Sequence, residues 1–270
     1  MPPAELPAYE PGDAFYFQGG ADYIASHVAG DEIVWRLGNR FEFVTNRNFV
    51  FPWISWESED ATSVSRTSSD SNAMWPLEVG NQARIHRELS FFKDKNDIDR
   101  PHKALTYLEE RDCEVLDTVS ISVKAGRFDT FKIRCERYLN RRSYAGAIIF
   151  YYSPLVGHFV KKVSTRSASG AGIMELVSHS IALHGVDDAV RSALARHFQQ
   201  TLETSPTDRT AEWESNDGHV RSETTITKTF ISENGGYCRN YAQRLTVKDR
   251  QRTVHGLACR RDNGTWAQSF

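Results

Sequence analysis

The chain has 270 residues, of which 40% are hydrophobic and 11% aromatic, so it can form one large β domain or two ordinary domains around a sizeable core. Its formal net charge of -2 excludes a strongly basic nucleic-acid binder, which would need a concentrated excess of Lys and Arg. No stretch approaches the roughly 20 apolar residues that cross a bilayer as a helix, so we expect no transmembrane segment in this chain.

The sequence opens with MPPAELPAYEPGD, which lacks the charged region and the apolar region of a signal peptide. Two interpretations stay open: a cytoplasmic protein, or a mature exported chain whose signal was removed and replaced by Met1. The Pro-rich composition predicts a flexible tether over residues 1–14. Such a tether would suit a chain with a removed signal or a lipid anchor upstream of Met1.

Residues 15–56 predict a meander of short strands, because aromatic and β-branched runs are bounded by Gly, Asn or Asp. FVFPWISWE follows at 49–57, and its Pro52 argues against a central strand. We interpret its aromatic side chains as core of a curved sheet. The alternative is an exposed platform, on which Trp53 or Trp56 stacks on a sugar ring or meets lipid or a partner protein.

Residues 57–73 are rich in Ser and Asp and predict a solvated loop. Strand patterns then return, and SASGAG at 167–172 predicts a hairpin turn. The clear helical pattern is residues 187–203, which Asp187 or Asp188 can cap. The sequence therefore predicts a mainly β protein with two antiparallel β-rich domains joined through one helix. An aromatic domain spans 15–183, as a curved sheet or open barrel, and a helix with a small sheet spans 184–270.

The four cysteines allow three disulfide pairings, and hairpin geometry selects one of them. If Lys248-Asp249 forms a two-residue turn, Cys238 and Cys259 lie directly opposite each other, within disulfide reach. Cys113 and Cys135 have the same symmetry, because each lies eleven positions from Lys124 in a KAG turn.

Each of these loops holds about 20 residues, so each bridge would contribute about 3 kcal/mol of stability through the unfolded state. Disulfides of this kind persist in an oxidising compartment. The alternative is four buried, reduced thiols that pack as small hydrophobic groups.

The C-terminal stretch YCRNYAQRLTVKDRQRTVHGLACRRDNGTW carries a recognisable pattern. A Tyr-Cys-Arg start is followed by a second Tyr, a polar hairpin, Gly-x-Ala-Cys-Arg and a Gly-x-Trp ending. This pattern resembles the C-terminal domain of the rickettsial seventeen-kilodalton surface antigen family of bacterial outer-membrane lipoproteins. The residues that carry the resemblance are Tyr237, Cys238, Arg239, Tyr241, Gly256, Ala258, Cys259, Arg260, Gly264 and Trp266, with Trp213 in the preceding AEWES segment.

The resemblance covers residues 187–268 and implies a non-catalytic module with an envelope address, in the periplasm or at the outer membrane of a Gram-negative bacterium. Family members often carry a lipid-attachment cysteine and a Gly-rich segment upstream. This sequence has neither, and an aromatic β domain stands in their place. AGRFDTFKIRCER and YYSPLVGHFVKK are also similar to segments of uncharacterised bacterial envelope proteins.

Catalytic patterns are absent from the sequence. Gly-x-Ser-x-Gly does not occur, the nine histidines lack metal-ligand spacing, and no C-x-x-C is present, so we expect no cofactor and no metal. His158 is the most interesting histidine, since Tyr151 and Tyr152 lie near it in sequence; the alternative is a strand histidine with a satisfied hydrogen bond. Glu109-Glu110 predicts a solvated face.

The basic, aromatic stretch FKIRCERYLNRRSY at 131–144 could bind an anionic glycan or a phosphate, or be a solvated strand end. The leading hypothesis is a non-enzymatic envelope protein that binds or scaffolds an envelope protein or glycan. One alternative is an envelope enzyme, or enzyme accessory, that acts on glycan or lipid through a cleft in the N-terminal domain with His158. Another is a structural subunit of an envelope assembly.

Overall fold

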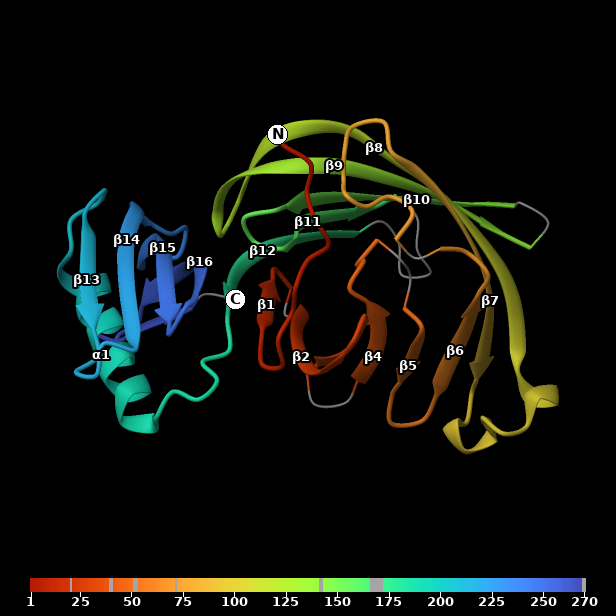
Figure 1. Ribbon diagram of the computed structural model, residues 1–270, viewed down its shortest axis with the longest axis horizontal. Helices are drawn as coiled ribbons and strands as arrows, with labels where there is room; N and C mark the ends of the chain where they lie inside the picture. The colour runs from red at the N-terminus through yellow and green to blue at the C-terminus, as the bar shows by residue number, and fades with distance from the viewer. Residues whose placement is uncertain are drawn as a thin grey trace. The chain divides into compact units, whose positions relative to one another are not determined.

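Figure 1 shows the computed structural model, which describes residues 1–270 apart from 20, 39–40, 51–52, 71, 141–142, 166–171 and 269–270. The described chain is mainly β with one α-helix, which confirms the fold class predicted from the sequence. Pro52 and most of the SASGAG segment lie outside the described residues. Within the described part, no helix combines the length and the apolar character needed to span a membrane.

The chain divides into two compact units. The N-terminal unit comprises Met1–Gly12, Ala21–Ile121 and Phe128–Glu175. The C-terminal unit comprises Asp13–Gly20, Ser122–Arg127 and Leu176–Phe270.

Antiparallel strands build the N-terminal unit, and each pairs with the next along the chain (Figure 1). Two short 3-10 helices, η1 (Lys95–Asp97) and η2 (Pro101–Lys103), connect β7 to β8. The strands that lie wholly or mostly in this unit, or begin in it, are β2 (Ala21–Ala29), β3 (Glu32–Leu37), β4 (Phe41–Asn46), β5 (Ser55–Glu57), β6 (Thr62–Thr67), β7 (Gln82–Phe92), β8 (Leu105–Val123), β9 (Gly126–Leu139), β10 (Ser143–Ser153), β11 (His158–Ser164) and β12 (Gly172–Ser180).

One face of this sheet is mostly apolar. Directly paired residues on neighbouring strands share a face, so the register defines rows of side chains across the sheet. We call the face that carries the following row the inner face. The row is Trp35, Phe43, Trp56, Ser63, Phe91 and Leu105, from β3 to β8.

The stretch 57–73 differs from the prediction of a solvated loop. Thr62–Thr67 forms β6, which pairs with both β5 and β7. Ser63 is buried, because it lies in the inner row between Trp56 and Phe91. A small side chain fits between two aromatic rings, so the sheet accepts a polar segment that composition alone assigns to a loop.

The C-terminal unit packs one helix against a second antiparallel meander (Figure 1). Helix α1 (Asp188–Thr204) begins at Asp187, whose side chain accepts hydrogen bonds from the backbone N–H groups of Ala189 and Val190. This agrees with the predicted helix and cap. The strands are β1 (Ala14–Phe17), β13 (Thr210–Glu214), β14 (Val220–Ile231), β15 (Tyr237–Val247), β16 (Arg250–Arg260) and β17 (Trp266–Gln268).

Both predicted disulfides are present. Cys238 and Cys259 are direct partners between β15 and β16, with their Cα atoms 4.1 Å apart. Val247 pairs with Arg250, so Lys248-Asp249 is the predicted two-residue turn. Cys113 on β8 is linked to Cys135 on β9, with a Cα–Cα distance of 4.0 Å.

Candidate ligand-binding site

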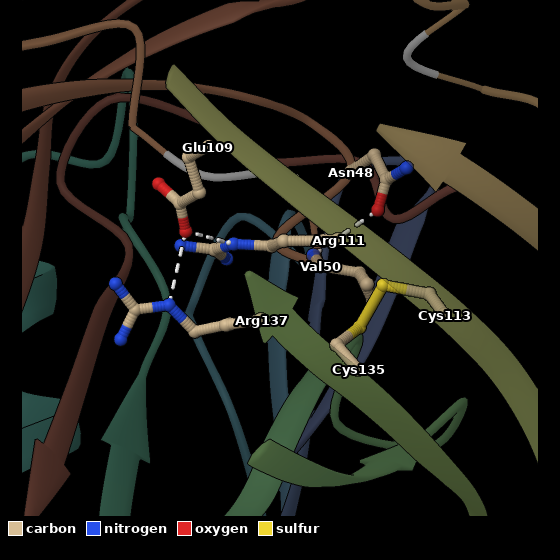
Figure 2. The surroundings of a disulfide bond; sticks show 7 residues. All are labelled: Asn48, Val50, Glu109, Arg111, Cys113, Cys135 and Arg137. Atoms are coloured by element: carbon tan, nitrogen blue, oxygen red, sulfur yellow. Dashed lines mark hydrogen bonds and ion pairs between the residues drawn. A yellow bond between two sulfur atoms is a disulfide. The ribbon is translucent and has the colours of Figure 1, made fainter. Parts of the chain in front are cut away.

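A buried ion-pair cluster lies on the inner face of the N-terminal unit, centred on Glu109 of β8. Its carboxylate accepts hydrogen bonds from Arg87 Nε at 2.7 Å, and Arg87 Nη2 lies on the same oxygen. The other oxygen accepts from Arg111 Nε at 2.8 Å and Arg137 Nε at 2.9 Å. Figure 2 shows Arg111 and Arg137 meeting at this carboxylate beside the disulfide. Three guanidinium groups therefore share one carboxylate.

The register of the strands explains why these side chains meet. Arg87 and Glu109 are direct partners between β7 and β8. Arg111 precedes Cys113 by two residues, and Arg137 follows Cys135 by two. Because alternate residues of a strand share a face, both arginines lie on the face where the disulfide is buried.

Burial and the neighbouring charges act in opposite directions on this cluster. Burial by itself would raise the pKa of Glu109, but the three guanidinium groups outweigh it and hold that pKa far below its usual range. Burial lowers the pKa of Arg87 to about 10, against the opposing effect of Glu109. Burial also lowers the pKa of Arg111. Glu109 is therefore ionised at neutral pH, and Arg87 is charged.

Lys162 of β11 adds a fourth cation to the cluster. It pairs with Phe150 of β10, and its Nζ lies 6.0 Å from the ring centroid of Phe159. Burial, together with the charges of Arg111 and Arg137, lowers the pKa of Lys162 to about 8. No carboxylate in the described part of the chain forms an ion pair with it. We use the name cationic cluster for Glu109 with its partners Arg87, Arg111 and Arg137, together with Lys162.

Partly exposed apolar side chains continue the inner face beyond Arg87. Arg87 Nη1 donates to the backbone carbonyl of Trp53 at 3.0 Å, and its Cζ lies 6.0 Å from the centroid of the Trp53 ring. The Trp53 ring lies 6.3 Å from that of Trp56. The apolar patch consists of Trp53, Trp56, Phe91, Leu105 and Tyr107.

The large side chains of the apolar patch are only partly covered. Trp53 is 38% exposed, Leu105 43% and Tyr107 37%, while Trp56 and Phe91 are half-buried. Tyr107 pairs with Leu89, two residues beyond Arg87, so the patch directly adjoins the cationic cluster. The two tryptophans that the sequence offered as a platform or as core therefore lie at the edge of the inner face, only partly covered.

His158 and Tyr152 lie inside a buried aromatic cluster, where the charge of Lys162 also acts on His158. His158 is 2% exposed, and its Nδ1 is hydrogen-bonded to the Tyr9 hydroxyl at 2.8 Å. Burial lowers the pKa of His158 to about 3, so its imidazole is neutral at physiological pH. Tyr152 is stacked on Phe49, with ring centroids 5.1 Å apart. This is the environment of a packed core histidine.

Tyr151 lies on the opposite face of β10 from Tyr152. It pairs with Lys132 of β9 and Lys161 of β11, and Lys161 is in an ion pair with Glu175. The five sequence candidates thus fall in three places. Trp53 and Trp56 adjoin the cationic cluster, Tyr152 and His158 are in the aromatic core, and Tyr151 is on the outer face.

The predicted solvated face at Glu109-Glu110 is wrong for Glu109. Its side chain is 1% exposed, whereas Glu110 of the opposite face is 29% exposed and lies 3.9 Å from His86 Nδ1. The sequence did carry a signal. Glu109 and Arg111 lie four and two residues before Cys113, so a buried disulfide at Cys113 predicts that both face inward.

Surface hollows on the described part of the N-terminal unit include two that are lined partly by charged side chains. One, of about 460 Å³, is lined by side chains that include Arg36, Phe41 and Lys95. The other, of about 620 Å³, lies on the outer side near Arg84 and Arg134. His158 lines neither hollow. Among the described residues, no group of three His, Cys, Asp or Glu side chains is arranged to hold a metal ion.

The C-terminal unit is similar in sequence to known proteins. Residues 200–267 match the family described as 17 kDa outer membrane surface antigen. The 17 kDa surface antigens of Rickettsia conorii and Rickettsia rickettsii are each 33% identical over 82 residues, and that of Rickettsia australis is 34% identical over 80. These matches cover 30% of this chain and 52% of each relative. The resemblance of the C-terminal part to these antigens is therefore confirmed.

The chain spans about half the length of the curated relatives it matches. Two solved structures share a distant likeness. The hypothetical lipoprotein YmcC from Escherichia coli aligns with 61% of this chain and 81% of its own, at a TM-score of 0.42 and 10% identity. An exported protein with a YmcC-like fold from Bacteroides fragilis aligns with 64% and 97%, at a TM-score of 0.35 and 12% identity. The surface antigen matches associate the C-terminal part with the bacterial envelope or surface.

Proposed function

We propose that this chain is a non-enzymatic binding protein of the bacterial envelope, in the periplasm or associated with the outer membrane. The observation that carries the proposal is the match of residues 200–267 to outer membrane surface antigens. Two disulfides support it, because structural disulfides persist in oxidising compartments such as the periplasm.

A binding role is supported by the inner face of the N-terminal unit. Three arginines share one carboxylate there with a lysine beside them, and large apolar side chains next to this cluster stay partly exposed. Groups that only fill a core are usually apolar and covered, so these residues fit a surface that receives a ligand. His158 does not favour the enzyme alternative, because it is buried among aromatic rings and its pKa is about 3.

The compartment is tested by fractionating the native organism with thiols alkylated at lysis. We expect the chain in the envelope fraction. A non-reducing peptide map should link Cys113 with Cys135 and Cys238 with Cys259. A cytosolic protein with four alkylated thiols would refute the envelope assignment. Crosslinking in intact cells then separates the finer roles, since a scaffold would capture a defined envelope protein and a ligand carrier would not.

A further inference from the structure

The cationic cluster has an excess of positive charge. Arg87, Arg111 and Arg137 bind the single carboxylate of Glu109, and Lys162 lies near enough to Arg111 and Arg137 for their charges to act on it, so the five groups have a net charge of +3 when all are ionised. The described residues supply no second carboxylate to these groups. A buried charge without a counter-charge is unfavourable, so the arrangement is complementary to an anion from outside the chain.

The hydrogen-bond donors of the cluster show where such an anion fits. Arg111 and Arg137 each use only Nε to bind Glu109, and their terminal nitrogens donate to no acceptor in the described part of the chain. In Figure 2 the terminal nitrogens of Arg137 lie on the side away from Glu109. Side-chain exposure is 23% for Arg137, and Lys162 is half-buried, so solvent reaches this side of the cluster.

A phosphate group matches these donors better than a carboxylate does. Planar guanidinium groups bind phosphate oxygens in pairs, and an ammonium group adds a point charge. A phosphomonoester also carries about −1.5 to −2 charges near neutral pH, which offsets more of the excess than the single charge of a carboxylate.

The apolar patch indicates what is attached to the phosphate. Trp53 contacts Arg87, and Tyr107 and Leu105 continue the same face with 37% and 43% of their surface exposed. A free phosphate would leave this surface uncovered. A ligand with an apolar portion would cover it while its headgroup binds the cations.

We propose that the inner face of the N-terminal unit binds a lipid with a phosphate headgroup, an inference that rests on the binding role proposed above. The phosphate is bound by Arg111, Arg137 and Lys162. The apolar portion lies on the patch of Trp53, Trp56, Phe91, Leu105 and Tyr107. No covalent step is involved.

The test uses the full chain and three soluble probes: dihexanoyl phosphatidic acid below its micelle concentration, dihexanoyl phosphatidylcholine, and inorganic phosphate. Binding is measured by isothermal titration calorimetry and by tryptophan fluorescence, since Trp53 and Trp56 adjoin the site. We expect phosphatidic acid to bind at one site. It should bind at least about tenfold more tightly than the other two probes, because they lack either its net charge or its apolar portion.

Two pairs of variants control for non-specific attraction. Lys162→Met should weaken phosphatidic acid binding about tenfold or more, whereas Lys161→Met removes the same charge from the outer face and should change it less than about twofold. Tyr107→Ser and Leu108→Ser form the second pair. Tyr107 is on the inner face and Leu108, 57% exposed, is on the outer face. Only the first should weaken binding.

Three results would overturn the inference. One is no binding of phosphatidic acid to the wild-type chain, which does not depend on how any variant folds. Another is equal weakening by Lys161→Met and Lys162→Met, the result expected of surface electrostatics. The third is tight binding of inorganic phosphate with no gain from the acyl chains, which would assign the cluster to free phosphate. If the chain is found in the envelope fraction, none of these three results would contradict the proposed compartment.

Discussion

The sharpest stability prediction concerns Glu109→Gln. The substitution keeps the shape of the side chain and one acceptor oxygen but removes the charge that Arg87, Arg111 and Arg137 share. Removing one partner of a buried ion pair costs about 3–5 kcal/mol, because the remaining charge is left uncompensated. Since Gln retains one acceptor, we expect a loss near the lower limit, about 3 kcal/mol.

A loss of that size corresponds to a fall in Tm of about 6–12 °C for a domain of 150–250 residues. The assay is urea unfolding followed by near-UV circular dichroism, with the midpoint compared at constant slope. Glu110→Gln is the matched control, because the neighbouring carboxylate lies on the outer face and is 29% exposed. It should cost less than about 1 kcal/mol.

The dependence on pH gives an independent check. The folded-state pKa of Glu109 lies below its unfolded value, so its contribution is fully present above the unfolded pKa of about 4.3 and is lost as the pH falls below it. The difference between wild type and Glu109→Gln should therefore be constant near neutral pH and shrink below about pH 4. Equal stabilities of Glu109→Gln and Glu110→Gln at pH 7 would refute the buried cluster.

Three further predictions concern other parts of the chain. Lys162→Met should stabilise the folded state by about 1–2 kcal/mol at pH 7, because the folded-state pKa of Lys162, about 8, lies below its unfolded value of about 10.4. This gain in stability should vanish as the pH rises from about 8 to about 10.4, which chemical denaturation across pH 7–11 would measure. Replacing Cys238 and Cys259 by Ser should cost about 3 kcal/mol and remove the effect of reductant on the midpoint of the C-terminal unit. Gly256→Ala should cost about 1–3 kcal/mol by thermal unfolding, since its Cβ would lie 2.5 Å from the Tyr241 hydroxyl.

Local spacing in the sequence was sufficient to predict the two hairpins and the helix. Cys238 and Cys259 are symmetric about Lys248-Asp249, and the structure pairs them directly. Asp187 precedes an apolar helical pattern, and it caps α1. In each case the deciding interaction joins residues within about 20 positions, so a single stretch of sequence contains all the necessary information.

The stretch 57–73 could not be assigned in this way. Its Ser and Thr residues are typical of a loop, but Thr62–Thr67 forms a strand because β5 and β7 lie on either side to pair with it. Ser63 lies between the rings of Trp56 on β5 and Phe91 on β7, and only a small side chain fits there. Both rings belong to other strands, so the residues near Ser63 in sequence do not reveal this constraint. Composition does not contain this information.

The candidate site was predictable only in part. Trp53 and Trp56 were identified from their aromatic run, and the stretch 131–144 contains Arg137, which binds Glu109. Glu109 itself was assigned to a solvated face, since an acidic pair on a strand is usually exposed. Which of two neighbouring carboxylates turns inward depends on the strand's register, and that register is fixed by the disulfide at Cys113.

The position of this disulfide also explains how the sheet tolerates its cations. Because Cys113 on β8 bonds Cys135 on β9, Arg111 and Arg137 come to opposite positions two residues away, where like charges repel and destabilise strand pairing. Glu109 screens the two charges by accepting a hydrogen bond from each, and the disulfide offsets the repulsion with about 3 kcal/mol of stability. Replacing a buried ion-pair cluster by well-packed apolar residues is often neutral or stabilising, so folding alone does not require these charges. Strands held together against the repulsion of their own side chains are therefore better explained by an anionic ligand than by folding alone.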